Sequence, residues 1–466
     1  MIKYIIKFGG TILNKNNSLN KITDILKKYD NNYIIVVSAI EGITDRLENV
    51  VREIKNHRLN FEKIDYIIKF LKNTHINILK QYNKLDNNYN ILNSIDEELL
   101  SLTKLLKGSI YINDITDFIE DEILSYGEKL SCLIYTYLLK KRDIKINQLF
   151  PENAGILTDG TYKKAMVKLK QTEENLRKTI KKNQNYIIPG FYGISKSKKI
   201  TIFGRNGSDY TAGILGYCLN VKFVDLWKSV DGFMSSNPKY VTNAISLKYL
   251  SYFEAAELSY FGADILHSNT IDPLYKKSIP LRIFNFNSKV DLNKPNTVIQ
   301  SKQNSNIILK SITFKNDIGV LKFIGSDVGK KPGIIANISS LLSKKNINIK
   351  SIFTSQTTIN FLLSKNNLNK ALNIFENKDL AGIESIDYLK DVSLIAVIGD
   401  GIDKKEGVIS KILNLVSKKG VNIEIISGGA SRSAFYFIIK QEELFKILDP
   451  IHNFILKEYK REVVNV

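Results

Sequence analysis

The sequence is poor in the residues that build disulfide frameworks and metal centres. Its 466 residues include 2 Cys, 4 His, 8 Pro and 1 Trp. Two cysteines cannot form a disulfide framework, and no two histidines stand at a spacing typical of metal ligands. We therefore predict no metal site, and we expect these side chains to serve packing or to lie on the surface. They are Cys132, Cys218, His57, His75, His267 and His452.

Long hydrophobic runs are missing as well. No apolar stretch of the sequence reaches the ~20 residues needed to span a bilayer. The first apolar stretch, residues 2–8, contains Lys3 and Lys7 and continues into Gly9 and Gly10, so we do not expect a signal peptide. The sequence predicts a cytoplasmic globular protein with no membrane partner.

Positive charge exceeds negative charge, but the excess forms no basic stripe. The chain has 67 Lys and Arg against 47 Asp and Glu, which gives a net charge of +20. Such a balance is found in nucleic-acid-binding proteins. Here the lysines are scattered among Asn, Ile and Tyr along the chain, as AT-rich codon usage would produce, and no helix-turn-helix or RNP-like pattern appears. We expect no nucleic-acid partner; a basic surface also suits an anionic substrate such as a nucleotide.

The N-terminal part of the chain alternates short apolar runs with helical patterns. Residues 2–8 and 33–37 are apolar, β-branched and too short for helices, and a helix that begins at Ser18 is expected between them. This order predicts a parallel sheet covered by helices, an α/β fold. The other expected strands are 186–189, 199–203 and 221–226, and the other expected helical stretches are 44–106, 124–139 and 209–219.

The pattern changes after a polar stretch at residues 288–305, which is the candidate domain boundary. Beyond it, a short unit occurs twice, and each copy has the order strand, turn, helix, "NI", strand. The copies are most alike at "KKNINIKSI" (344–352) and "KKGVNIEII" (418–426). We infer an internal duplication of a small βαβ unit.

The standard phosphate-binding loops are absent, but glycines stand where strands end. Neither G-x-x-x-x-G-K-[ST] nor a strand-linked G-x-G-x-x-G occurs. Lys7, Gly9 and Gly10 close the first strand, and ligands of open α/β sheets bind beyond the carboxyl ends of the strands. Two glycines let backbone N–H groups approach a phosphate closely, while Lys7 adds positive charge. A plain β-turn is the alternative from this segment alone.

Three other polar side chains each allow two interpretations. Ser38 follows the second strand and Thr44 lies shortly after it, and each either bonds a ligand or caps a helix. Glu128 lies on the apolar face of the helix expected at 124–139. A carboxylate there needs a cationic partner, either in a structural salt bridge or as the ammonium group of a ligand.

Residues 204–209 form the most specific segment. Arg205 offers a bidentate fork for a carboxylate, and Ser208 and Asp209 stand where a helix N-terminus attracts anions. The loop at 224–238 carries turn signals, and it either holds a nucleotide base or is a turn without a ligand-binding role.

Together, these motifs are similar to those of the aspartate kinases of the amino-acid kinase family. The resemblance covers the whole chain apart from a loosely matched helical stretch at about 46–120. The matching motifs, in order, are "KFGGT" (7–11), "VVSA" (36–39), "SYGEKLS" (125–131), "PGFYG" (189–193), "FGRNGSDYTAG" (203–213), "WKSVDGFMSSNP" (227–238) and "FEAAELSYFGADILH" (253–267). The duplicated C-terminal unit resembles the paired ACT domains of this family, which bind amino-acid inhibitors.

The resemblance implies an amino-acid-kinase-like open, mainly parallel sheet with helices on both faces, followed by two ACT-like βαββαβ units. The implied domains are a catalytic domain at 1–300, a first ACT-like domain at 317–388 and a second at 389–466. The second is expected to be split, with its first strand at about 306–316.

The implied reaction is ATP plus L-aspartate to ADP plus 4-phospho-L-aspartate, the first step of aspartate-family amino-acid biosynthesis. ATP would be a substrate with Mg²⁺, with no tightly bound cofactor. The residues implied as catalytic are Lys7 and Asp209, and those implied for aspartate are Ser38, Thr44, Glu128, Arg205 and Ser208. Those implied for ATP are Lys7, Gly9, Gly10, Lys228, Ser229, Asp231 and Lys289.

The chain departs from the family pattern at several positions. Asn206 replaces a glycine, and because Asn tolerates left-handed backbone we expect the turn to survive. Ser229 replaces an Asp beside the nucleotide, so we expect activity with weakened ATP binding. In the first ACT-like unit, the implied regulatory residues are Asp327, Ser355 and Gln356, with lysine or threonine as the effector.

Three further expectations complete the sequence-based hypothesis. ACT units commonly pair through exposed strands, so we expect a homodimer. Because the chain ends just after the second unit, we expect no fused homoserine dehydrogenase. A non-catalytic amino-acid sensor is the alternative function, and a kinase for glutamate or acetylglutamate fits the Glu128 segment and the paired ACT units less well.

Overall fold

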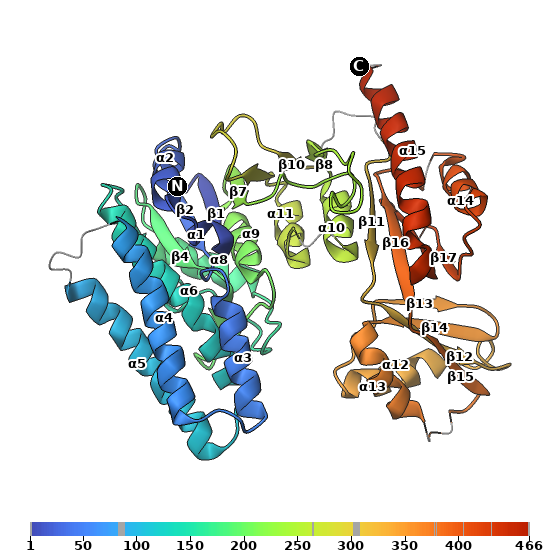
Figure 1. Cartoon of the computed structure of the whole chain (residues 1–466), viewed down its shortest axis with the longest axis horizontal. Helices are drawn as coiled ribbons and strands as arrows, with labels where there is room; N and C mark the ends of the chain where they lie inside the picture. The colour runs from blue at the N-terminus through green and yellow to red at the C-terminus, as the bar shows by residue number, and fades with distance from the viewer. Residues whose placement is uncertain are drawn as a thin grey trace. The chain divides into compact units, whose positions relative to one another are not determined.

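The computed structural model describes residues 2–464 apart from 83–88, 263–264, 302–307, 377, 379, 404 and 430. The chain divides into two units, labelled by element in Figure 1. Unit 1 is Met1–Phe233, Ser246–Tyr252 and Asp264–Gln303, and unit 2 is Met234–Ile245, Phe253–Ala263 and Asn304–Val466. Residues 306–307 of the strand expected at 306–316 lie outside the described residues.

Unit 1 is built on a mainly parallel sheet with the strand order β3-β4-β2-β1-β7-β9-β10-β8. The central pairs are parallel, and β10 is antiparallel to β9. This confirms the predicted sheet. The strands are β1 (Tyr4–Phe8), β2 (Tyr33–Val37), β3 (Asn147–Gln148), β4 (Tyr186–Pro189), β7 (Phe223–Lys228), β8 (Tyr249–Leu250), β9 (Leu281–Asn285) and β10 (Thr297–Ile299), with β5 (Tyr192–Ile194) and β6 (Ile200–Ile202) as a separate antiparallel pair.

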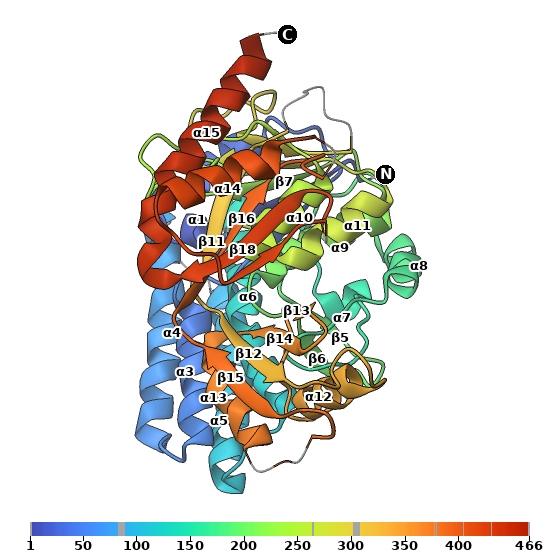
Figure 2. The same cartoon turned by 90° about the vertical axis from the view of Figure 1, so that its right-hand side faces the viewer.

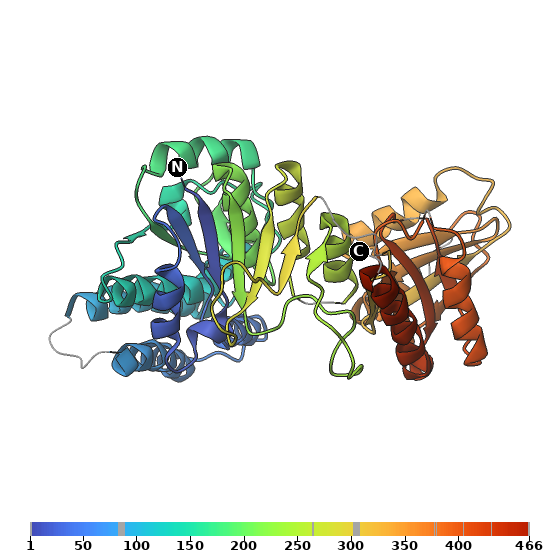
Figure 3. The same ribbon diagram turned by 90° about the horizontal axis from the view of Figure 1, so that it is seen from above.

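Helices cover both faces of this sheet, as Figure 3 shows from above. Within the stretch expected to be helical at 44–106, residues 83–88 lie outside the described residues, and the described part contains most of α3, all of α4 and most of α5. The helices of unit 1 are α1 (Gly10–Leu13), α2 (Ser18–Leu26), α3 (Ile43–Lys55), α4 (Phe61–Tyr82), α5 (Tyr89–Ile112), α6 (Asp117–Lys140), α7 (Pro151–Ala154), α8 (Leu169–Thr179), α9 (Gly207–Leu219), η1 (Ser268–Thr270) and α11 (Ile271–Lys276). In the described part of the chain, no helix is both long and apolar enough to cross a bilayer.

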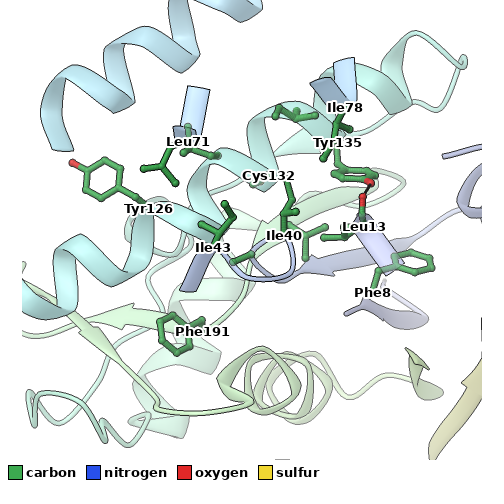
Figure 4. Packing of buried hydrophobic residues seen from close by; sticks show 14 of the residues in the cluster. Phe8, Leu13, Ile40, Ile43, Leu71, Ile78, Tyr126, Cys132, Tyr135 and Phe191 are labelled. Carbon is green, nitrogen blue, oxygen red and sulfur yellow. Dashed lines mark hydrogen bonds between the residues drawn. The ribbon is translucent and has the colours of Figure 1, made fainter. Parts of the chain in front are cut away.

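Helix α6 contributes many side chains to an apolar core of unit 1. Figure 4 shows its Cys132 and Tyr135 packed among side chains of α1, α3 and α4. The Tyr135 hydroxyl donates to the carbonyl of Leu13, so this buried ring keeps a hydrogen bond. Cys132 is fully buried, which confirms the expected packing role.

Unit 2 contains two antiparallel sheets with helices, the ACT-like fold that the resemblance implied (Figure 2). One sheet has the order β13-β14-β12-β15 and the other β11-β16-β18-β17, so β11 joins the strands of the second repeat. The elements are α10 (Tyr252–Phe261), which enters unit 2 at Phe253, β11 (Ser311–Lys315), β12 (Gly319–Ile324), α12 (Ile334–Lys344), β13 (Ser351–Thr354), β14 (Thr358–Leu363), α13 (Lys365–Phe375), β15 (Ser385–Leu389), β16 (Val392–Ile398), α14 (Val408–Lys418), β17 (Ile425–Ser427), β18 (Ala434–Lys440), η2 (Gln441–Glu443) and α15 (Leu444–Val464).

A buried ion pair joins β7 and β9 in the sheet of unit 1. Asp225 is fully buried, and the guanidinium of Arg282 donates to both of its carboxylate oxygens at 2.7 and 2.6 Å. The Tyr29 hydroxyl donates to the same carboxylate at 2.6 Å. A buried charge is tolerated because it is paired and hydrogen-bonded in this way.

Asp225→Asn should therefore destabilise unit 1 by about 3 kcal/mol or more, because it leaves the largely buried guanidinium of Arg282 without its counter-charge. Urea unfolding followed by tryptophan fluorescence measures the effect. The matched control is Asp272→Asn, which breaks an exposed i,i+4 pair with Lys276 and should cost less than about 0.5 kcal/mol. Equal losses in the two variants would contradict the prediction.

Candidate active site

The carboxyl ends of β1, β2 and β7 open into one pocket of unit 1 with a volume of about 760 Å³. This is where ligands of parallel α/β sheets bind. The predicted residues that line it are Lys7, Gly9, Gly10, Ser38, Thr44, Glu128, Arg205, Ser208, Lys228 and Ser229.

A buried carboxylate, Asp209, holds two lysines beside this pocket. Asp209 lies in the first turn of α9 and is fully buried. Lys7 of β1 places its Nζ 2.7 Å from Oδ1 of Asp209, and Lys228, the last residue of β7, places its Nζ 2.7 Å from Oδ2. Because β1 and β7 are adjacent parallel strands, one carboxylate can bind a lysine from each.

The two ion pairs set the charge of this cluster. Burial alone would raise the pKa of Asp209, but the charges of Lys228 and Lys7 outweigh it and hold that pKa below its usual value. Burial lowers the pKa of Lys228, and Lys7 adds to this, while Asp209 opposes both. Lys228 also donates to the carbonyl of Ile265, which lines the pocket. The cluster therefore places two cations around one anion at the strand ends.

Of the two glycines after β1, Gly10 is required by close packing and Gly9 is not. A Cβ on Gly10 would lie 2.3 Å from the carbonyl oxygen of Ala39, which real Cβ atoms do not tolerate. A Cβ on Gly9 would lie 3.7 Å from Nζ of Lys7, so bare backbone stands next to that amine. A ligand can thus reach the backbone of Gly9 and the amine of Lys7 together.

Glu128 is the second buried carboxylate of the pocket, and it differs from Asp209. It is 3% exposed, and its Oε2 has no hydrogen-bond partner within the described structure. Burial raises the pKa of Glu128 to about 8, because a backbone hydrogen bond from Ala39 and the charge of Lys7 offset only part of the cost. Among the described residues no side chain forms the structural salt bridge that the sequence left open, so this carboxylate is available to a cationic ligand.

The turn before α9 presents Arg205 and Ser208 to the pocket. Gly204 and Asn206 both adopt left-handed backbone, with φ of +84° and +60°. Asn206 therefore keeps the turn, as expected of an Asn in place of a glycine. Arg205 is exposed and Ser208 is buried, and both line the pocket.

Two residues predicted for ATP do not line this pocket. Asp231 is exposed and accepts a hydrogen bond from the Asn285 side chain at 2.6 Å. Lys289 lies in a separate surface depression beside Lys28. The Lys21 and Lys28 amines bind carbonyls of residues 288 and 290 and hold this segment near the end of α2. A role of either residue in ATP binding stays a prediction, without support from the pocket geometry.

One charged wall of the pocket was not predicted from the sequence. On α3, Asp45, Glu48, Arg52 and Lys55 follow each other at intervals of three or four residues, so they share the helix face that lines the pocket. Lys55 and Lys163 bind Glu120 of α6 at 2.5 and 3.0 Å. The regular spacing on α3 is a signal that could have identified this wall; Lys163 lies in a loop and gives no such signal.

The predicted regulatory residues meet in the first ACT-like unit. Asp327 follows β12 and binds Lys331 at 2.5 Å. Ser355 and Gln356 form the turn between β13 and β14, and the carbonyl of Gln356 accepts the N–H of Gly329 at 2.8 Å. Across the described residues, no group of three or more His, Cys, Asp and Glu side chains is arranged to hold a metal ion.

Comparison with known protein families gives three matches along the chain. A model described as the amino acid kinase family matches residues 3–285. Two models described as ACT domains match residues 313–377 and 395–453. The first range covers most of unit 1 together with residues 234–245 and 253–263 of unit 2, and the other two ranges lie in the two repeats of unit 2.

Curated relatives extend the match to nearly the full chain. Aspartokinase 1 of Arabidopsis thaliana is 28% identical over 469 residues, covering 97% of this chain and 80% of that protein. Lysine-sensitive aspartokinase 3 of Escherichia coli is 25% identical over 457 residues, covering 96% and 98%. The bifunctional aspartokinase/homoserine dehydrogenase of Buchnera aphidicola is 28% identical over 465 residues, and this chain spans 56% of its length.

Solved structures share the fold. Aspartokinase III of E. coli in complex with aspartate and ADP has a TM-score of 0.83 at 23% identity, covering 97% of this chain and 99% of that one. Clostridium acetobutylicum aspartate kinase has a TM-score of 0.76 at 25% identity, with the same coverages of 97% and 99%.

The raised pKa of Glu128 predicts that its carboxyl destabilises the folded protein when it ionises. The folded-state pKa of about 8 lies above the usual 4.5, so the unfolded chain releases this proton at lower pH than the folded protein. Stability from this group is then lost as the pH rises from 4.5 to 8. Glu128→Gln should raise the melting temperature by roughly 5 °C at pH 8 and change it little near pH 5.

Differential scanning calorimetry across this pH range measures the effect. Glu48→Gln is the matched control, because Glu48 lines the same pocket but is exposed. A Glu128→Gln variant with wild-type stability at pH 8 would show that the carboxyl is not destabilising.

Proposed function

Because this chain belongs to the amino acid kinase family, we propose that it transfers the γ-phosphoryl group of ATP to the side-chain carboxylate of L-aspartate. The products are ADP and 4-phospho-L-aspartate, and the reaction would open aspartate-family amino-acid biosynthesis. Relatives named aspartokinases support the substrate assignment. The observation that carries the proposal is the pair of lysines on Asp209 in one pocket with Glu128 and Arg205.

The chemistry needs positive charge more than it needs a base. A carboxylate with a pKa near ~3.9 is already ionised at neutral pH, so no group has to remove a proton from the nucleophile. An anion must, however, approach a polyanion, and the rate then depends on positioning and charge neutralisation. Lys7 and the Gly9 and Gly10 amides would steady the transferring group, while Asp209 holds Lys7 and Lys228 in place.

The two ends of the amino acid have complementary partners. Arg205, exposed at the pocket, would bind the α-carboxylate through its guanidinium fork. Glu128 would bind the ammonium group, and the ion pair would replace the missing partner of its Oε2. Ser38, Thr44 and Ser208 line the same pocket and would contribute hydroxyl groups. Substrate binding would thus give the buried carboxyl a cationic partner, and it would favour the ionised form of Glu128.

ATP would lie on the side of the pocket formed by β1 and β7. Ser229, which follows β7, has its Oγ 3.4 Å from Oγ1 of Thr11, so both hydroxyls stand near the lysine pair. Magnesium would arrive with ATP and neutralise part of the phosphate charge. The oxygens of Asp209 each bind a lysine, so phosphate oxygens and water would be the main ligands of that ion.

We further propose feedback regulation through the first ACT-like unit, by lysine or threonine acting at Asp327, Ser355 and Gln356. A relative named lysine-sensitive supports this regulation. Pairing of ACT units through exposed strands would make the protein a homodimer. An unchanged rate at about 5 mM lysine and threonine, roughly saturating for a millimolar site, would contradict the regulation.

A hydroxamate-trap assay tests the reaction directly. With ATP, Mg²⁺ and L-aspartate, hydroxylamine should capture an acyl phosphate whose formation depends on aspartate. Lys7→Ala should lower the rate by about 10²- to 10³-fold, the usual effect of removing one charge-stabilising donor.

Lys3→Ala is the matched control, because Lys3 directly precedes β1 and pairs with Asp30 on the surface. It should keep the wild-type rate. Absence of any aspartate-dependent product from folded protein at high ATP would reject the kinase and favour a non-catalytic amino-acid sensor.

A further inference from the structure

The two ACT-like repeats of unit 2 carry the same pair of loops. In the first repeat, the N–H of Gly325, after β12, donates to the carbonyl of Thr357 in the β13–β14 turn at 2.9 Å. In the second, the N–H of Gly399, after β16, donates to the carbonyl of Ser433 in the β17–β18 turn at 3.0 Å. This correspondence pairs Ser326 with Asp400, Ser355 with Ser431 and Gln356 with Arg432.

The backbone N–H after each glycine binds a carboxylate, but the two carboxylates differ. Ser326 N–H donates to Oε1 of Glu384 at 2.9 Å, and Glu384 is exposed. Asp400 N–H donates to Oε1 of Glu254 at 2.8 Å, and Glu254 is fully buried. An exposed carboxylate can be displaced by one from solution, whereas a buried one cannot leave without a large desolvation cost.

Helix α10 supplies the second carboxylate of this repeat as well. The Ser431 hydroxyl donates to Oε1 of Glu257 at 2.5 Å, one turn after Glu254 on α10. The Arg432 guanidinium lies 4.7 Å from the ring centroid of Phe253 on the same helix. Both loops of the second repeat therefore contact one helix, through hydrogen bonds typical of carboxylate recognition.

A buried lysine fixes this arrangement. Nζ of Lys310, just before β11, lies 2.9 Å from Oε2 of Glu254, and the two side chains are 2% and 0% exposed. At the end of α10, a Cβ on Gly262 would lie 2.5 Å from the carbonyl oxygen of Phe314 in β11. The helix is thus anchored at both ends against the second repeat.

We propose that the second ACT-like repeat has a carboxylate-binding site and that α10 fills it as an internal ligand. Glu254 and Glu257 occupy the loops that the duplication would otherwise offer to the carboxylate of a free amino acid. A soluble amino acid is then bound by the first repeat alone. The count of one effector per chain rests on the regulation proposed above, whereas the occupancy of the second site by α10 does not.

Chemical rescue with acetate tests the occupancy in the full chain. Glu257→Ala removes one carboxylate without touching the Glu254–Lys310 pair, and it should lower the melting temperature by roughly 2–4 °C. Sodium acetate should restore at least half of this loss relative to sodium chloride at equal ionic strength. The double variant Glu257→Ala/Ser431→Ala should not respond to acetate, because the hydroxyl donor is gone.

Two controls make the result specific. Glu384→Ala changes the exposed carboxylate of the first repeat and should leave the melting temperature within about 1 °C of wild type, as for most surface substitutions. Glu257→Gln keeps an acceptor for Ser431 and should lose less than Glu257→Ala. Equal stabilisation of the wild type and Glu257→Ala by acetate, or no response of Glu257→Ala, would overturn the proposal.

Equilibrium dialysis with labelled L-lysine and L-threonine measures how many effector molecules bind per chain. The wild type should bind at most one molecule per chain, and two would overturn the internal ligand. Binding of neither amino acid would instead reject the regulatory part of the proposed function, and acetate rescue would still decide whether α10 occupies the second site.

Discussion

One buried carboxylate, Asp209, organises the site of unit 1. It is fully buried, and each of its oxygens lies 2.7 Å from a lysine. An unpaired charge at this depth would cost several kcal/mol, so the carboxylate requires both lysines, and the lysines require it. Lys7 lies next to the end of β1, Lys228 ends β7 and Asp209 lies in the first turn of α9, so this one requirement fixes two strands and a helix together. It also concentrates positive charge where a polyphosphate would bind.

Glu128 is a second buried carboxylate, but it lacks the ion pairs that stabilise the charge of Asp209. Glu128 is also buried, yet one of its oxygens has no hydrogen-bond partner within the described structure, and its pKa is raised to about 8. The ionised Glu128 therefore destabilises the folded protein, whereas the ion pairs of Asp209 offset the cost of its burial. Such a contrast between neighbouring acids is typical of functional sites, where a group is kept ready for a ligand. The ammonium group of an amino acid is a ligand that would complete it.

Much of the site was predictable because it follows local sequence rules. Apolar runs with terminal glycines identified β1 and its turn, and the segment before α9 identified Arg205, Ser208 and Asp209. The charged face of α3 was missed although its regular spacing is visible in the sequence, because the sequence does not show that this face lies at the pocket. The docking of α10 was equally invisible: Glu254 and Asp400 are 146 residues apart, and Glu257 and Ser431 are 174 apart. The duplication can be recognised in the sequence, but the packing of α10 against the second repeat cannot.

The most direct test of this account is the turnover number of Asp209→Asn, measured as aspartate-dependent acyl phosphate on protein shown to be folded by circular dichroism. The amide keeps the size of the side chain but removes the charge that holds Lys7 and Lys228 together. The account predicts a fall of about 100-fold or more, because the two cations would no longer be held at the transferring group. A variant with the wild-type turnover number would contradict it.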